Sequence, residues 1–194
     1  MTDKIRNKTI ALLVLAGAQF IVVLDATITN VALPALASAL NFADNAQLQW
    51  VVTAYTLLFG GFLLLGGRLS DLIGRRKVFL SGIGIFAISS LFAGFAQNPE
   101  QMIIFRGLQG LGAALLSPAA LSLLLTIFKE GKERNQAMGV WSGVAAGGGA
   151  VGLLLGGILT QYASWRWIFF INVPVSIIVI ALSMRFLPAD SATK

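Results

Sequence analysis

The sequence predicts an all-α integral membrane protein that folds as a single bundle of six transmembrane helices over residues 1–194. Three observations lead to this prediction. Hydrophobic residues make up 57% of the chain and charged residues only 11%, which is too little charge to cover a soluble domain. Six apolar runs are close to or above the roughly 20 residues that cross a bilayer. Most basic residues lie between these runs, where they would orient the helices.

Polar or helix-breaking segments separate the six apolar runs. Pro34 is predicted to end the first run, because proline lacks the N–H that a helix interior needs. The predicted spans are residues 9–33, 48–67, 78–96, 102–128, 136–160 and 168–187. The segments that separate the later runs are 71–77, 97–100, 129–134 and 163–167.

The distribution of basic residues predicts the orientation of the chain. All but two of the 14 Lys and Arg residues precede the first span, follow the last, or lie near the loops after the second and fourth spans. These positions share one side of the membrane, and basic residues concentrate in cytoplasmic loops, so both termini are expected in the cytoplasm. The exceptions are Arg106, inside the fourth span, and Arg166, before the sixth. The net charge of +6 is thus a topology signal, and no nucleic-acid partner is expected.

The composition gives an enzyme little support. The chain has no His and no Cys, which removes the commonest general base and the usual metal ligands. Residues 147–152, GGGAVG, match a dinucleotide-binding pattern, but they lie inside a predicted span with no strand before them. No phosphate-binding G-x-x-x-x-G-K-[ST] sequence is present. We therefore expect no enzyme activity, no metal and no cofactor.

Asp25 lies well inside the first span, where a carboxylate costs about 2.5–3.5 kcal/mol. Such a residue should face the bundle interior or a wet cavity. Thr29 falls near the same helix face, and Asn30 lies further round. A buried carboxylate could exchange protons or attract an organic cation. The alternative is a hydrogen-bonded aspartate near the outer end with a structural role only.

Arg106 is the second charge inside a span. Gln109 lies on the same face of the fourth predicted helix. A guanidinium stays charged and needs a partner in the membrane, and Asp25 is one candidate. The alternative is an arginine near the outer boundary whose side chain reaches the interface.

The fifth span is rich in glycine. Gly148, Gly152 and Gly156 repeat every four residues, so another helix could approach closely along this stripe, and Gly157 follows it. Each glycine costs up to about 1 kcal/mol in a helix relative to alanine. The run therefore indicates a role in packing or bending.

Residues 66–80, GGRLSDLIGRRKVFL, gather charge between the second and third spans. Gly67 would allow close packing and Gly74 a tight turn. Asp71 could cap a helix N-terminus or pair with Arg75. As a charged hairpin between two spans, this arrangement is common.

Five motifs in the sequence resemble those of the major facilitator superfamily. The pattern Gly67-x-Leu69-x-Asp71-x-x-Gly74-Arg75-Arg76 resembles the family's signature between spans two and three. LDATITNVALP (24–34) is similar to the span-one motif of the drug:proton antiporters with fourteen spans. Arg106-x-x-Gln109-Gly110 resembles the span-four motif, and Gly148-x3-Gly152-x3-Gly156-Gly157 resembles the span-five antiporter motif. WRWIFFINVP (165–174) is similar to the start of span six in the same family.

The resemblance implies the N-terminal six-span half of a proton-coupled multidrug efflux transporter in the plasma membrane. The proton gradient would supply the energy, and the cargo would be small amphipathic or cationic compounds. Asp71 and Arg75 would form a cytoplasmic latch, and the glycines of span five would bend and seal that helix. The residues implied in the proton and substrate pathway are Asp25, Thr29, Asn30, Arg106 and Gln109.

The sequence departs from the family pattern in three ways. Leu72 replaces a basic residue of the loop signature, and Leu153 replaces the proline of the span-five motif, which leaves another transport mode open. The third departure is that the family builds its pathway between two six-span bundles, with a substrate site at their interface, whereas one bundle is predicted here. We therefore expect a second half as partner, as a continuation of the same gene, a separate chain or a second copy. The alternatives are transport of another small solute, or a half that does not transport alone.

Overall fold

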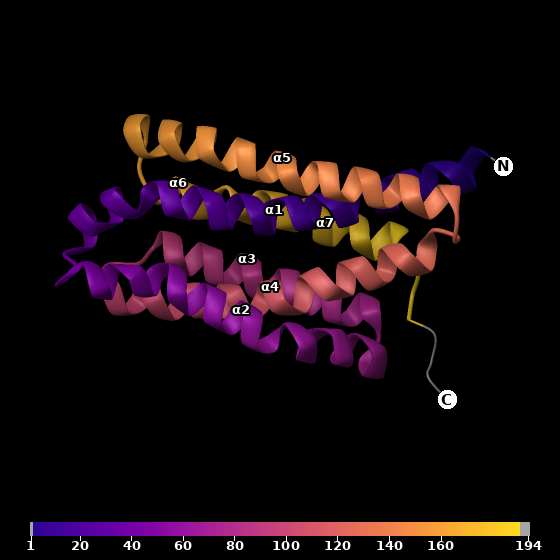
Figure 1. The fold of residues 1–194 in the computed structure, drawn as a ribbon, viewed down its shortest axis with the longest axis horizontal. Helices are drawn as coiled ribbons and strands as arrows, with labels where there is room; N and C mark the ends of the chain where they lie inside the picture. The colour runs from indigo at the N-terminus through magenta and orange to yellow at the C-terminus, as the bar shows by residue number, and fades with distance from the viewer. Residues whose placement is uncertain (1, 191–194) are drawn as a thin grey trace.

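The computed structural model describes residues 2–190, and it describes side chains from residue 7 onward. Within this part of the chain the backbone is helical apart from short connections and contains no strand (Figure 1). Six stretches are long and apolar enough to cross a membrane, with α6 and α7 together forming the sixth, so the predicted fold class is confirmed. The helices are α1 (Thr2–Leu40), α2 (Asn45–Ile73), α3 (Arg75–Gly94), α4 (Pro99–Ile127), α5 (Lys132–Tyr162), α6 (Trp167–Phe170) and α7 (Asn172–Phe186).

The first two helices are longer than predicted. α1 continues through Pro34 to Leu40, so the prediction that Pro34 ends the first span is wrong. Proline removes only one intrahelical bond, and in apolar surroundings every other backbone group still needs its helical partner. The end comes before Asn41, whose φ of 56° lies in the left-handed region that terminates helices. α2 likewise passes its predicted end at residue 67.

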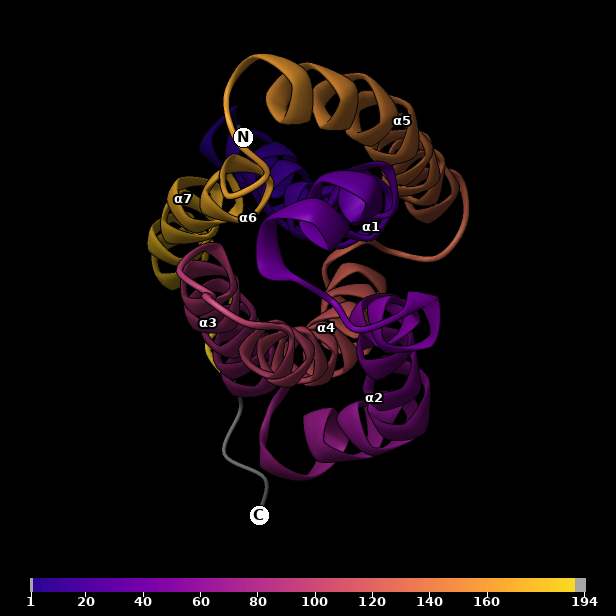
Figure 2. The ribbon, with the colours of Figure 1, turned by 90° about the vertical axis from the view of Figure 1, so that its left-hand side faces the viewer.

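The helices form two layers that meet where α1 contacts α4 and where α7 contacts α3. Viewed end on, α5, α1 and the α6–α7 pair lie together, and α2, α4 and α3 lie together opposite them (Figure 2). α5 packs chiefly on α1, just as α2 packs chiefly on α4. The second span thus packs on the fourth as the fifth packs on the first. This correspondence is expected when the last three spans repeat the first three in inverted orientation.

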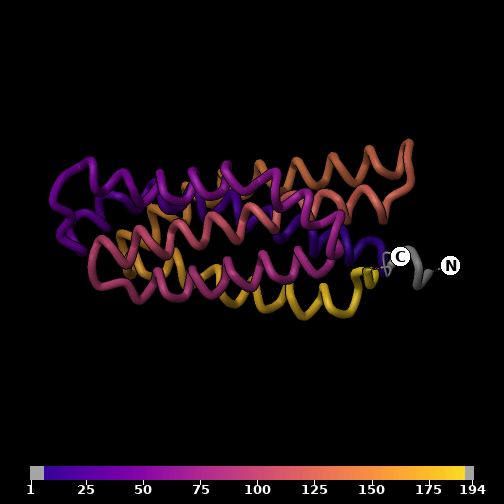
Figure 3. Tube along the Cα trace, turned by 90° about the horizontal axis from the view of Figure 1, so that it is seen from below, coloured from indigo at the N-terminus to yellow at the C-terminus, as the bar shows by residue number. Residues whose placement is uncertain are grey.

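The beginning of α1 and the end of α7 lie at the same end of the elongated bundle (Figure 3). Asn7 and Arg185 line one cavity there, with a volume of about 540 Å³. Lys8 pairs with Glu133 of α5 at 2.5 Å at this same end. Basic residues that are far apart in the sequence therefore gather at one end of the molecule.

Close contact between α2 and α4 depends on glycine. A Cβ atom added at Gly66 would lie 2.2 Å from the carbonyl oxygen of Ala114. One added at Gly110 would lie 2.3 Å from the carbonyl oxygen of Tyr55. By contrast, a Cβ at Gly67 would meet its nearest neighbour at an ordinary 3.9 Å. The prediction that Gly67 allows close packing is therefore wrong, because its neighbour Gly66 faces α4.

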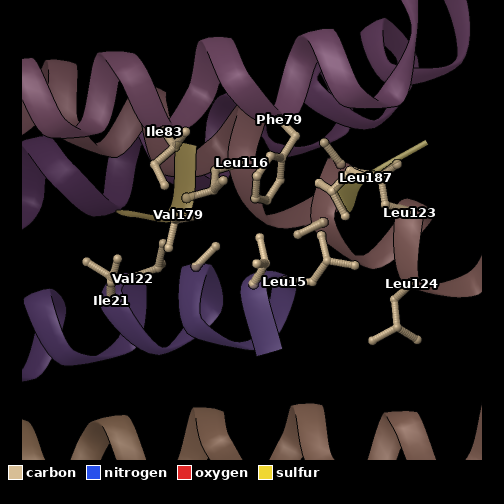
Figure 4. Close-up of a cluster of buried hydrophobic side chains, with 14 of the residues drawn as sticks. Leu15, Ile21, Val22, Phe79, Ile83, Leu116, Leu123, Leu124, Val179 and Leu187 are labelled. Carbon is tan, nitrogen blue, oxygen red and sulfur yellow. The ribbon is translucent and has the colours of Figure 1, made fainter. Parts of the chain in front are cut away.

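Two apolar clusters fill the interior at different depths. One contains Leu15, Ile83, Leu116 and Val179, which come from α1, α3, α4 and α7 and meet in the bundle centre (Figure 4). The other lies further toward the opposite end and contains residues of α1, α2, α3, α4 and α6, including Phe169. Between the two clusters, α1, α3, α4 and α7 contribute buried polar side chains. These polar side chains form the candidate site.

Candidate functional site

Five buried polar side chains form one hydrogen-bonded cluster, the polar layer. Each is at most 1% exposed, although they come from four helices. On α1, α3 and α4 they lie between residues of the two apolar clusters, and Asn172 lies between Phe169 of α6 and Val179 of α7, so packing above and below holds them at one level. The members are Asp25 of α1, Ser90 of α3, Arg106 and Gln109 of α4, and Asn172 of α7.

Asp25 and Arg106 form an ion pair inside the bundle, with Nη1 of Arg106 2.6 Å from Oδ2 of Asp25. Arg106 also donates to Oε1 of Gln109 at 2.7 Å and to the carbonyl of Val51 at 3.3 Å. Its guanidinium lies 4.4 Å from the ring centroid of Tyr55, which adds a cation–π contact. The interpretation of Arg106 as an interfacial side chain is wrong, because the side chain is enclosed and directed at Asp25.

The second oxygen of Asp25 is held by two amides. Nε2 of Gln109 and Nδ2 of Asn172 each donate to Oδ1 at 2.8 Å. Three donors therefore surround one carboxylate that has no contact with solvent in this half. A buried ion pair persists only when such additional hydrogen bonds offset the loss of water.

Ser90 and Asn172 were not predicted as site residues. Oγ of Ser90 accepts from Asn172 at 3.0 Å and from Gln109 at 3.2 Å, and its hydroxyl donates to the carbonyl of Phe169 at 2.9 Å. Asn172 had a detectable signal, since it is a polar residue within an apolar span. Ser90 had none, because a serine in an apolar helix commonly bonds to its own backbone.

Thr29 and Asn30 differ in their relation to this cluster. Thr29 is fully buried one turn from Asp25, and its hydroxyl has no hydrogen-bond partner among the described residues. Asn30 is exposed and donates to the carbonyl of Ala26 at 2.8 Å, so the structure does not bring it to the cluster. Its position follows from helical geometry, since it lies well round the helix from Asp25.

Three of the four motif glycines of α5 contact α1 on either side of Asp25 along the helix. Added Cβ atoms would lie 2.9 Å from the carbonyl oxygen of Phe20 at Gly148, 3.0 Å from that of Leu24 at Gly152, and 2.9 Å from Cβ of Val31 at Gly156. Gly157 has open space around it in the described structure. Leu153, where the family motif has proline, points away from the bundle and is 58% exposed.

The loop motif lies at the end of the bundle, apart from the polar layer. Asp71 is inside α2, so it does not cap a helix, and it lies 3.8 Å from Arg75 in an exposed pair. Gly74 makes the turn with φ of 111°, a conformation that favours glycine. Leu69 packs against the core, and Leu72 is exposed.

Additional contacts tie the loop motif to the rest of the bundle. Arg75 donates to the hydroxyl of Thr126 on α4, and Arg76 donates to the carbonyl of Met184 on α7. The Asp190 carboxylate accepts from the backbone N–H groups of Arg76 at 2.9 Å and of Lys77 at 3.1 Å. It thereby satisfies donors that the first turn of α3 leaves free. The predicted basic residue at position 194 lies outside the described residues.

The chemistry available to the polar layer is narrow. It contains one carboxylate, one guanidinium, two amides and a hydroxyl, and across the described residues no group of His, Cys, Asp or Glu could hold a metal. A carboxylate in this setting can take up or release a proton, and proton uptake would remove its ion pair with Arg106.

Comparison with known proteins gives consistent relatives. The family model of the Major Facilitator Superfamily matches residues 15–194. The puromycin resistance protein pur8 of Streptomyces alboniger is 50% identical over 182 residues, covering 94% of this chain and 36% of that protein. The cephamycin export protein CmcT of Amycolatopsis lactamdurans is 46% identical over 186 residues, covering 96% of this chain and 38% of that protein. The chain thus spans well under half the length of these relatives.

The fold also matches a solved structure. The proton:xylose symporter XylE, bound to 6-bromo-6-deoxy-D-glucose, superimposes with a TM-score of 0.83. The match covers 95% of this chain and 46% of that chain, at 15% sequence identity. At this identity the likeness concerns the fold, with one six-helix bundle corresponding to about half of the longer protein.

Proposed function

Because the chain belongs to the major facilitator superfamily, we propose that it forms one six-helix half of a secondary transporter that expels small amphipathic or cationic compounds in exchange for protons. The observation that carries the proposal is the ion pair between Asp25 and Arg106, 2.6 Å long and enclosed within a membrane-spanning bundle. The curated resistance and export proteins among the relatives support efflux as the direction of transport. The resemblance of the span-one motif supports the branch with fourteen spans.

The ion pair gives proton binding a mechanical consequence. Asp25 is on α1, which carries α5, and Arg106 is on α4, which carries α2. When Asp25 is ionised, the pair draws these two units together. Protonation neutralises the carboxylate and leaves the guanidinium without its counterion, which favours a different arrangement of α1 and α4. Proton uptake and release would in this way alternate the bundle between two packings.

The pathway itself requires a second bundle. α2 and α5 lie at the outside of this bundle, with large exposed side chains such as Leu57, Leu64, Leu154 and Ile158. These faces would meet the second half of the transporter, supplied by the same gene product, another chain or a second copy. The motif at residues 67–76 would act at the cytoplasmic end, with both termini on that side and the protein in the plasma membrane. The energy comes from the proton gradient, without a cofactor.

A second candidate is transport of a different small solute. It is favoured by α5, which runs without interruption from Lys132 to Tyr162 and has Leu153 in place of the family's proline. The two candidates differ in how transport responds to the pH gradient. In proton antiport, the cationic dye and the protons cross the membrane in opposite directions. Reversal of the pH gradient therefore reverses the direction of dye movement.

The test is the substitution Asp25→Asn in the intact protein. A lipophilic cationic dye is added outside everted membrane vesicles, and its uptake is followed while a pH gradient, acidic inside, is imposed. We expect loss of gradient-driven transport with normal membrane insertion, because the amide keeps the size of the side chain but cannot ionise. Asp44→Asn is the matched control, since Asp44 caps α2 by accepting from Gln47 and asparagine caps equally well. Full transport in the Asp25→Asn protein would refute the role of Asp25.

A further inference from the structure

Asn172 stands at an irregular point of the sixth span. α6 ends at Phe170 and α7 begins at Asn172, and Pro174 has no N–H to offer the carbonyl of Phe170 four residues earlier. One residue earlier, the carbonyl of Phe169 accepts the hydroxyl of Ser90 at 2.9 Å. Asn172 follows at the start of α7 and donates to Asp25.

Both N–H groups of the Asn172 amide are used, and its oxygen is not. Nδ2 donates to Oδ1 of Asp25 at 2.8 Å and to Oγ of Ser90 at 3.0 Å. Oδ1 of Asn172 is buried and has no hydrogen-bond partner within residues 7–190. An unpaired buried acceptor costs free energy, so its presence beside the one buried carboxylate calls for a reason.

In the structure, Ser90 accepts from the amides of both Asn172 and Gln109. Its hydroxyl hydrogen is directed at the carbonyl of Phe169 at 2.9 Å. Oε1 of Gln109 is already bound by Arg106 at 2.7 Å. Of the two amides that touch Asp25, only that of Asn172 therefore has a free acceptor.

The two protonation states of Asp25 need different partners. A carboxylate only accepts hydrogen bonds, whereas a carboxylic acid must also donate one. Arg106 from α4 is the charged group facing Asp25, and Tyr55 from α2 lies against Arg106. α3 and α7 add only Ser90 and Asn172 to the cluster, and α5 places glycines against this part of α1. Within the polar layer, the buried acceptor without a partner is Oδ1 of Asn172.

We propose that Asn172 is a positioning residue whose amide turns over with the protonation state of Asp25. It presents N–H to the carboxylate and, after rotation by about 180° about its last torsion, C=O to the carboxylic acid; the Ser90 hydroxyl, which then faces the same C=O, turns from Phe169 to donate to it. The oxygen that is unpaired in the ionised state becomes the acceptor in the protonated state. The hydrogen bonding at the start of α7 thereby changes when Asp25 on α1 takes up a proton. This inference rests on the proposed function, since it requires that Asp25 takes up a proton.

Infrared difference spectroscopy of the purified intact protein, recorded between high and low pH, tests the proposal. The carbonyl band of protonated Asp25 is assigned by its loss in Asp25→Asn. We expect Asn172→Leu to move this band to higher wavenumber, because the acid loses the acceptor for its O–H. Ser176→Ala is the matched control, since Ser176 is fully buried one turn further along α7 and outside the polar layer, and the band should not move.

A second measurement needs no substitution at Asn172. In protein labelled with ¹³C-asparagine, the side-chain carbonyl of Asn172 should shift to lower wavenumber as Asp25 protonates, and this shift should vanish in Asp25→Asn. An Asp25 band that is indifferent to Asn172→Leu, or a labelled carbonyl that does not respond to pH, would overturn the inference alone. A protein in which no Asp25 band develops at any pH would overturn the proposed function as well.

Discussion

Replacement of Gly66 and of its neighbour Gly67 by alanine should change stability in opposite directions. At Gly66 the new Cβ would lie 2.2 Å from the carbonyl oxygen of Ala114 and 3.1 Å from Cα of Leu115. Both neighbours are helix backbone, so α2 and α4 must separate by roughly 1 Å to admit the methyl group. At Gly67 the nearest heavy atom would be Cβ of Pro118 at 3.9 Å, which is ordinary contact.

The expected magnitudes follow from two opposing effects. Alanine is favoured over glycine in a helix by about 1 kcal/mol, and this gain applies at both positions. Overpacking a well-filled interface costs about 1–3 kcal/mol, and the short backbone contact places Gly66→Ala at the upper end. We therefore expect Gly66→Ala to lower the free energy of unfolding by about 2 kcal/mol. Gly67→Ala should raise it by up to about 1 kcal/mol.

The assay is reversible unfolding of the intact protein in mixed micelles, with helix content followed by circular dichroism as the fraction of denaturing detergent rises. Transport is not the appropriate measure, because Gly67 also belongs to the loop motif. If Gly66→Ala is as stable as Gly67→Ala, or more stable, the close approach of α2 to α4 at Gly66 is refuted.

Two further predictions concern single side chains. Arg106→Lys should reduce gradient-driven transport by about tenfold or more in the vesicle assay, because a lysine keeps the charge but cannot make the three hydrogen bonds and the ring contact of the guanidinium; transport at the normal rate would show that charge alone is sufficient. Asp190→Ala should speed hydrogen exchange of the backbone amides of Arg76 and Lys77 by roughly threefold to thirtyfold, which corresponds to the loss of a capping carboxylate. Asp190→Asn retains an acceptor and serves as the control, and equal exchange in the two variants would contradict the capping role.

The sequence alone was sufficient for the class of fold and for the two charged residues of the polar layer. Hydropathy is a local property, so apolar runs of sufficient length identify spans whatever they pack against. Asp25 and Arg106 were recognisable for the same reason, since a charge within such a run is costly and needs a compensating partner. The spacing of Gly148, Gly152 and Gly156 likewise indicated a helix contact.

Local signals were less reliable where a helix interacts with its neighbours. Pro34 looked like a helix end, yet α1 continues because the surrounding helices and apolar environment retain it. Gly66 and Gly67 are indistinguishable in the sequence, and only the position of α4 shows that the first of them makes the contact. Asn30 is close to Asp25 along the chain but is turned away from it.

Only the tertiary structure determined the composition of the polar layer. Asp25 is separated by 81 residues from Arg106, by 84 from Gln109 and by 147 from Asn172, yet all three donate to its carboxylate. No periodicity within one helix specifies which faces of four helices will meet at one depth. That choice is made by the packing of glycine-lined and apolar surfaces against one another, which fixes the rotation and height of every helix at once.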